Sequence, residues 1–311
     1  MLTGLSLGAT ALLLAAGIAL DLLLGEARRW HPLVGFGNLA SAIERRLNRG
    51  NARFIRGAIA WTVAVVPLTC LAGLAVDAGG YAVHALLLYL AIGLRSLREH
   101  NLPIVAALEE GQLERARALT GRIVSRDTAN ATPADLAKAS AESLLENGND
   151  AVFGTLFWFI VAGGAGAVLF RLANTLDAMW GYRSQRFLLF GRTAARIDDV
   201  LNYLPARLTA LSYVLLARER RSAWRCWRSQ ASAWSSPNAG PVMASGAGAL
   251  GVRLGGAATY DGVIEQRPPL GQGAEPVPAD IRRAWSLVVR TTLLWVAVMA
   301  LCALAAGALH A

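Results

Sequence analysis

The sequence predicts an all-α, polytopic integral membrane protein with about four to six membrane segments and a helical cytoplasmic portion. Of its 311 residues, 55% are hydrophobic and only 16% are charged, whereas soluble globular chains carry about 25% charged residues. Charge is absent from five stretches, residues 1–20, 57–76, 78–94, 151–170 and 291–309. Uncharged apolar runs near 20 residues are typical of helices that cross a bilayer. Runs of this length exclude a soluble enzyme. Because they are continuous rather than alternating, they also disfavour a transmembrane barrel.

We predict a single domain over residues 1–311. Its four spans lie at about residues 5–24, 57–76, 81–94 and 285–309. Residues 77–80, Asp-Ala-Gly-Gly, predict a tight turn between the second and third spans. Two further segments, 151–170 and 205–217, are either extra spans or re-entrant. The first is glycine-rich, and the second is too short for a ~30 Å hydrocarbon core.

The distribution of arginine predicts the orientation of the chain. The net charge is +9, and Lys138 is the single lysine among 30 basic residues. Seven arginines fall within residues 25–56, and basic loops of membrane proteins stay in the cytoplasm. We therefore expect 95–284 to be cytoplasmic, with 151–170 and 205–217 as a shallow re-entrant pair. Cytoplasmic loops explain the basic balance, so we expect no nucleic-acid partner.

Residues 95–150 carry dense charge with helical periodicity. Leu102–Ala118 is predicted to form one helix. The run Thr132-Pro-Ala-Asp135 predicts the start of another, with threonine as N-cap and proline in the first turn. That helix should end near Asn147, where Asn-Gly-Asn follows. Residues 229–262 are rich in serine, alanine and glycine, which favours a ligand-binding loop over a lipid-facing helix.

An acidic pair on the second of these helices is the first candidate for chemistry. Glu142 and Glu146 are four residues apart and share a helix face. Like charges at this spacing destabilise a helix unless a cation lies between them. Magnesium bound to nucleotide phosphates is one such cation. A solvated helix face without a ligand explains the pair equally well.

The second candidate is the Asp198-Asp199 pair between two apolar segments. Carboxylates near a bilayer are costly, so they are usually paired or functional. The surrounding polar residues are Asn174, Asp177, Arg192, Arg196, Asn202 and Arg207. The arginines could neutralise the pair structurally. Alternatively, the aspartates hold Mg²⁺ while the arginines hold phosphate or carboxylate.

Other motifs give weaker signals. Ser236-Pro-Asn238 and the glycines of 246–256 could approach an anion, but tight helix packing through small residues explains them as well. There is no Walker A loop and no GxSxG or HExxH run. His84, within an apolar run, is best interpreted as a packed histidine.

Taken in order, several runs resemble the CobD/CbiB family of cobalamin-biosynthesis proteins, the adenosylcobinamide-phosphate synthases. The runs are DLLLGE…HP (21–32), SRDT (125–128), AESLLENGND (141–150), LFW (156–158), NTLDAMWGY (174–182), FGRTAARIDDVLNYLPARLTA (190–210), SPNAGP (236–241), GALGVRLGG (248–256) and RPPLGQG (267–273). Nearly the whole chain is covered by this resemblance.

The resemblance implies a multi-pass enzyme of the bacterial inner membrane with a cytoplasmic active site. Such enzymes join adenosylcobyric acid to (R)-1-amino-2-propanol or its O-phosphate, forming an amide and consuming ATP with Mg²⁺. Other late corrin-pathway membrane enzymes are expected partners, besides the lipid bilayer. The catalytic residues implied are Glu142, Glu146, Asp198 and Asp199, the last two also holding the Mg²⁺ of ATP. The implied substrate- and phosphate-binding residues are Arg126, Asp127, Asn147, Asp150, Asn174, Asp177, Asn202, Arg207, Ser236 and Asn238.

Two other functions stay open. A non-catalytic membrane signalling protein like AmpE resembles the same family distantly and should lack the full set of acidic motifs, which this chain has. A small-molecule transporter should show inverted repeats and breaks in paired spans, and the sequence shows only one glycine-rich break.

Overall fold

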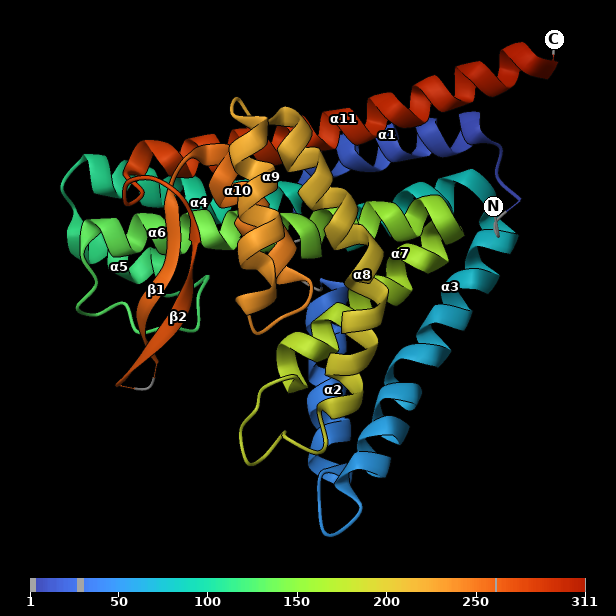
Figure 1. The fold of residues 1–311 in the computed structure, drawn as a ribbon. Helices are drawn as coiled ribbons and strands as arrows, with labels where there is room; N and C mark the ends of the chain where they lie inside the picture. The colour runs from blue at the N-terminus through green and yellow to red at the C-terminus, as the bar shows by residue number, and fades with distance from the viewer. Residues whose placement is uncertain (1–3, 27–30, 261, 311) are drawn as a thin grey trace. The chain divides into compact units, whose positions relative to one another are not determined.

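The computed structural model describes residues 4–26, 31–260 and 262–310, and helices make up most of it (Figure 1). The helices are α1 (Leu7–Leu24), α2 (Pro32–Leu47), α3 (Arg53–Ala91), α4 (Leu94–Glu109), α5 (Leu113–Thr120), α6 (Pro133–Asn147), the π-helix η1 (Gly148–Phe153), α7 (Gly154–Trp180), α8 (Arg192–Leu216), α9 (Arg220–Gln230), the 3₁₀ turn η2 (Ala231–Ala233), α10 (Ala239–Leu250) and α11 (Pro278–His310). Strands β1 (Arg253–Tyr260) and β2 (Val263–Gly271) form one antiparallel hairpin. The helical class is confirmed, but the purely α prediction missed this hairpin.

Four helical stretches of the described chain are long and apolar enough to cross a membrane: Leu7–Leu24, Arg53–Glu109, Pro133–Trp180 and Pro278–Leu309. The first and last coincide with predicted spans. The second contains both predicted middle spans, and the third contains 151–170. Residues 205–217 form no separate helix, because α8 already begins at Arg192. The side of the membrane on which each loop lies stays a prediction.

Contacts along the chain define two compact units. Unit 1 comprises Met1–Gly93, Asp150–Asn202 and Val296–Ala311, and unit 2 comprises Leu94–Asn149 and Tyr203–Trp295.

Unit 1 is built on two helices that are interrupted by glycine. The turn expected at 77–80 is a break inside α3 at Gly80, which has a φ of 59°, and the ribbon changes direction there (Figure 1). Helix α7 is broken at Ala162 and Gly163. A methyl group added at Gly154 would lie 2.2 Å from the Phe170 ring, although 16 helical residues span about 24 Å in a straight helix. The two halves of α7 therefore fold back on each other.

His84 joins the two broken helices. The Gly164 N–H donates a hydrogen bond of 2.9 Å to His84 Nδ1, and the imidazole packs edge-on against Phe159. His84 is buried. The prediction of a packed histidine is confirmed, and its ring satisfies a backbone donor that the break in α7 leaves without a helical partner.

Unit 2 confirms one predicted helix start and contradicts one predicted helix. The Thr132 hydroxyl and the Asp135 carboxylate form a complete capping box at the start of α6, which runs to Asn147 as predicted. The single helix predicted over Leu102–Ala118 is wrong. Gly111, with a φ of 71°, separates α4 from α5, because a left-handed residue ends a helix.

The ligand-binding loop predicted over 229–262 is also wrong. The segment forms the buried helix α10 and the first strand of the hairpin. Its glycines allow close packing: a methyl group at Gly246 would lie 2.7 Å from the Leu145 side chain, and one at Gly248 would lie 2.7 Å from the Ala223 backbone. Small residues here serve helix packing, the alternative that the composition left open.

Candidate functional site

Three carboxylates approach one another inside unit 1. Asp198 on α8 is buried, with 7% of its surface exposed, and it lies within electrostatic reach of Asp150 and Asp177. Asp150 lies in the π-helix η1, and Asp177 lies in the last turn of α7. Helix α6 ends at Asn147, as predicted, but the chain continues directly into η1. Such π-helical turns are frequent at functional sites.

Two asparagines hold these carboxylates. Asn202 donates a 2.8 Å hydrogen bond to Asp150 Oδ1 and also bonds Asp198. Asn174 donates a 3.4 Å hydrogen bond to Asp198 Oδ1. Asn174 lies one turn before Asp177 on α7, and Asn202 lies one turn after Asp198 on α8. The four-residue spacing places Asn202 on the same face of α8 as Asp198, whereas the hydrogen bond from Asn174 to Asp198 joins α7 to α8.

Burial is the main influence on the pKa of Asp198. Removal from water raises the pKa of its carboxyl well above the usual range, and the charges of Asp150 and Asp177 raise it further. The hydrogen bonds from the two asparagines act in the opposite direction. A carboxylate in such surroundings is stabilised as an anion by a bound cation.

Asp199 has different surroundings from its neighbour. Burial raises its pKa, and the positive charges of Arg183 and Arg196 oppose that shift. Residues i and i+1 point about 100° apart on a helix. The two aspartates predicted to hold one metal ion thus have different nearest charges, although Asp199 is also within electrostatic reach of Asp177.

Arg171 is a residue of this region that the sequence analysis did not assign. It lies within electrostatic reach of Glu26 and Asp150. Its Nε atom is buried and has no hydrogen-bond partner among the described residues. The only signal in the sequence was a lone arginine directly after an uncharged run.

The acidic cluster suits magnesium that arrives with phosphate better than a resident metal ion. Within the ranges that the structure describes, no three histidine, cysteine or acidic side chains come close enough together to hold a metal ion. Mg²⁺ bound to a nucleotide needs only one or two protein carboxylates, because phosphate and water supply its other ligands. Asp198 and its neighbours meet that requirement.

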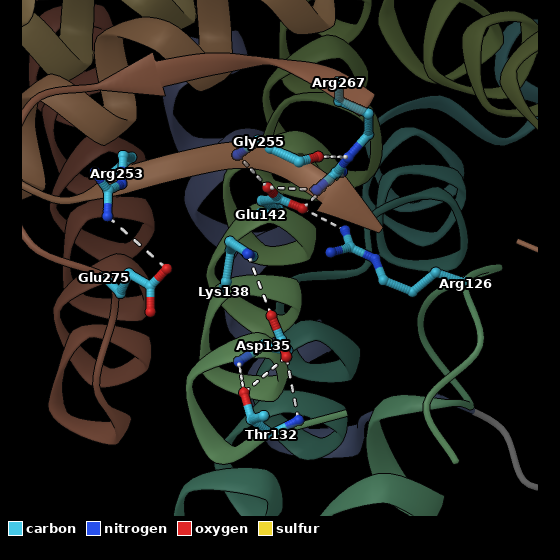
Figure 2. A network of polar contacts seen from close by, with 10 residues as sticks. Arg126, Thr132, Asp135, Lys138, Glu142, Arg253, Gly255, Arg267 and Glu275 are labelled. Carbon is cyan, nitrogen blue, oxygen red and sulfur yellow. Dashed lines mark hydrogen bonds and ion pairs between the residues drawn. The ribbon is translucent and has the colours of Figure 1, made fainter. Parts of the chain in front are cut away.

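A second polar network lies in unit 2 around Glu142 (Figure 2). The side chain of Glu142 is 3% exposed. Arg126 forms an ion pair with its Oε2, and Arg267 contacts both oxygens at 3.0 and 3.3 Å. The Gly255 N–H donates a 2.7 Å hydrogen bond to Oε1. Glu142 thereby joins helix α6, the loop before it and both strands of the hairpin.

Arg267 begins the RPPLGQG run (267–273), but the sequence predicted no role for it. Burial works against its charge, but the pairing with Glu142 raises its pKa. Its guanidinium also lies over the Trp234 ring at 5.6 Å. Glu146 follows one turn later on α6 and is half-buried, and Asn147 donates hydrogen bonds to the backbone and hydroxyl of Ser143.

The remaining predicted site residues of unit 2 form hydrogen bonds that hold loops against neighbouring segments. Asp127 accepts a 2.8 Å hydrogen bond from the Gly262 N–H at the end of the hairpin. Arg207 donates a 2.8 Å hydrogen bond to Asn238 Oδ1 and stacks over the Tyr203 ring at 3.5 Å. Ser236 Oγ accepts a hydrogen bond from the N–H of Ala239, the first residue of α10.

A groove of about 770 Å³ lies beside these contacts in unit 2. Its lining includes the loop residues Arg126 and Asp127, Lys138 on α6, and Thr259 and Ile264 from the hairpin. Lys138 forms an ion pair with Asp135 at 3.3 Å. The lining of the groove thus contains both paired charged side chains and apolar side chains.

Comparison with known proteins assigns the chain to a family. The family model described as CobD/Cbib protein matches residues 14–288. A protein named "Cobalamin biosynthesis protein CobD" from Chromobacterium violaceum is 53% identical over 97% of this chain and 99% of its own length. Proteins of the same name from Stutzerimonas stutzeri and Mycobacterium tuberculosis are 55% and 38% identical, over 91% and 86% of this chain and 94% and 88% of their own lengths. No solved structure matches the chain. The chain belongs to the CobD/Cbib family.

Proposed function

We propose that this protein acts in cobalamin biosynthesis as an amide ligase. It joins a carboxylate of adenosylcobyric acid to (R)-1-amino-2-propanol or its O-phosphate, and it consumes ATP. Family membership supports the pathway. The observation that carries the chemistry is the cluster that the buried Asp198 forms with the half-buried Asp150 and Asp177.

The acidic cluster can bind the metal of a nucleotide. A carboxylate and an amine do not condense unaided at neutral pH, and ATP with Mg²⁺ would supply the activation of the corrin carboxylate. Asp198 would hold the cation with Asp150 and Asp177 close by, and Asp199, which has Arg183 and Arg196 as nearby charges, would contribute less. Asn174 and Asn202 orient the carboxylates, and the buried donor of Arg171 is suited to an anionic oxygen.

The Glu142 network has a positioning role in this proposal. Two guanidinium groups and a backbone N–H already engage its carboxylate, which leaves little room for a metal ion. Glu142 would instead hold the Ser125–Thr128 loop and the hairpin in place. Arg126, Asp127, Arg207, Ser236, Asn238, Asn147 and Glu146 then shape the substrate-facing loops.

The transporter alternative gains one observation. It predicted breaks in paired spans, and the structure has breaks at Gly80 and at Ala162–Gly163. The groups next to them, His84 and the Gly164 N–H, satisfy each other. The relatives are named for cobalamin biosynthesis, and the acidic motifs that an AmpE-like protein should lack are present. We therefore favour the ligase.

The location of the protein follows from the same proposal. Four apolar helical stretches suit a multi-pass protein, and we place it in the bacterial inner membrane. The active site would face the cytoplasm, where ATP is available. Other late corrin-pathway membrane enzymes are proposed neighbours.

Growth complementation tests this function. Expressed in a bacterium that lacks its own synthase, the protein should restore growth that depends on cobyric acid. Membrane expression is verified by immunoblot, and a strain supplied with cobinamide serves as the control for the later steps. Normal expression with growth on cobinamide but not on cobyric acid would contradict the proposal.

A further inference from the structure

We propose that a basic pocket in unit 1 binds an organic phosphate, either a free phosphate ester or the headgroup of an anionic lipid. The pocket is a cavity of about 490 Å³ between α2, the start of α3 and the loop after α7. Its lining residues are Glu44, Arg45, Asn48, Arg49, Arg53, Gln185 and Arg186. This site lies outside the proposed catalytic residues, and its assignment does not rest on the proposed function.

The pocket carries an excess of three positive charges, because four arginines face one glutamate. Glu44 is already engaged: Arg186 Nε and Nη2 contact its two oxygens at 3.0 and 2.6 Å. Asn48 Nδ2 donates a further 2.7 Å hydrogen bond to it. Burial would raise the pKa of Glu44, but these hydrogen bonds and the charges of Arg186 and Arg45 outweigh burial and hold the pKa below its usual range. Glu44 therefore anchors Arg186.

The other three arginines form no direct ion pair within the described part of the chain. Arg45, Arg49 and Arg53 line the same cavity from the end of α2 to the first residue of α3. Like charges gathered around one cavity repel one another unless an anion lies between them. Guanidinium groups bind phosphate oxygens in bidentate pairs, so a phosphate group, whose oxygens can be shared among several arginines, fits this pocket better than a single carboxylate.

The start of α3 adds to the same electrostatic field. Ala52, with a φ of 61°, is the N-cap residue, and it is the only non-glycine residue of the described chain with a positive φ. The cap provides no side-chain hydrogen bond, and the first turn contains no acidic residue. The first N–H groups of α3, which begins at the pocket residue Arg53, carry partial positive charge.

A buried acceptor indicates what else the ligand carries. Asn48 Oδ1 is buried without a hydrogen-bond partner among the described residues, while its amide nitrogen donates to Glu44 and to the Arg186 carbonyl. A hydroxyl group on the ligand would satisfy this oxygen. An ester such as glycerol phosphate combines the phosphate and the hydroxyl.

Binding measurements on the full-length protein in neutral detergent test the proposal. The soluble probe is glycerol 3-phosphate, measured by calorimetry. The lipid probe is phosphatidylglycerol, measured by native mass spectrometry against phosphatidylcholine. The double variant R49Q/R53Q should bind one of the two probes at least tenfold more weakly than the wild type. The control R46Q removes an exposed arginine of α2 that lies outside the pocket lining, and it should bind as the wild type does.

Each outcome assigns or removes the site. A loss confined to glycerol 3-phosphate identifies a soluble phosphate ester as the ligand. A loss confined to phosphatidylglycerol identifies a lipid headgroup, and a loss of both supports the pocket for either source. Unchanged binding of both probes in R49Q/R53Q, an equal loss in R46Q, or no binding by the wild type would overturn the proposal. If the double variant does not fold, R45Q at an exposed pocket residue is judged by the same criteria.

Discussion

Asp198→Asn is expected to abolish most of the ligase activity without loss of stability. The amide keeps the shape of the side chain but loses the charge that would hold the cation. Removing one such electrostatic group typically lowers kcat on the order of 10²–10³-fold. An acid whose pKa is raised by folding contributes stability below its unfolded pKa and loses it as the pH rises through the folded pKa. At pH 7, above the unfolded pKa, burying Asp198 therefore costs stability, and the thermal midpoint of the variant should be equal to or above that of the wild type.

Asp199→Asn is the matched control, because it makes the same chemical change on the next residue. Asp199 is closer to solvent and is balanced by Arg183 and Arg196, so a loss of about tenfold or less is expected, given the small energies of exposed ion pairs. Steady-state kinetics and thermal unfolding are measured on both variants. If Asp198→Asn retains near-normal turnover, or loses activity only because it unfolds, the cluster is structural.

Glu142→Gln, in contrast to Asp198→Asn, is expected to lower the stability of the fold. The change leaves Arg126 and Arg267, whose side chains are 12% and 10% exposed, without their shared carboxylate. Removing one partner of a buried ion pair costs about 3–5 kcal/mol. For a chain of this size we expect the thermal midpoint to fall by about 5–10 °C.

The control for this variant is Glu114→Gln. Glu114 also pairs with an arginine, Arg117, at 2.6 Å, but its side chain is 83% exposed. Loss of an exposed pair of this kind costs about 0.3–0.5 kcal/mol. Thermal unfolding of the two variants in the same detergent separates buried from exposed pairing. A midpoint shift in Glu142→Gln no larger than in Glu114→Gln would contradict the network described here.

Local capping signals in the sequence predicted some of the structure. The start of α6 was predictable because Thr132 and Asp135 interact with their own backbone and need no tertiary contact. The end of α6 at Asn147 was predicted as well, but the π-helix η1 that follows was not. It depends on where Asp150 and Asn149 find partners, Asn202 and Thr209, which lie 52 and 60 residues away in the sequence. Within Leu102–Ala118, Gly111 could have predicted the break between α4 and α5. The prediction of one helix followed the helical periodicity of the segment instead.

The region after residue 229 shows where composition misled the prediction. Small residues that suit a loop also suit a buried helix, and only the presence of Leu145 opposite Gly246 distinguishes the two. The hairpin did leave a signal in the sequence, because the dipeptide Asp261-Gly262 is of the kind that favours tight hairpin turns.

The candidate site was predictable as a set of residues but not as a geometry. The motifs identified Asp150, Asp177 and Asp198, which the structure brings within electrostatic reach of one another. Nothing in the sequence showed that Glu142 would be engaged by Arg126 and Arg267, since the two arginines lie 16 and 125 residues away from it in the sequence. Pairing between distant residues depends on the tertiary fold.

The most direct test of the ligase proposal is the mass of the corrinoid product made by the purified protein. Wild-type protein in neutral detergent is incubated with adenosylcobyric acid, Mg²⁺ and each amine, with and without ATP. We predict a corrinoid heavier by the amine minus one water, formed only with ATP and strongly reduced in Asp198→Asn. Folded wild-type protein that leaves adenosylcobyric acid unchanged with both amines and ATP would contradict the account.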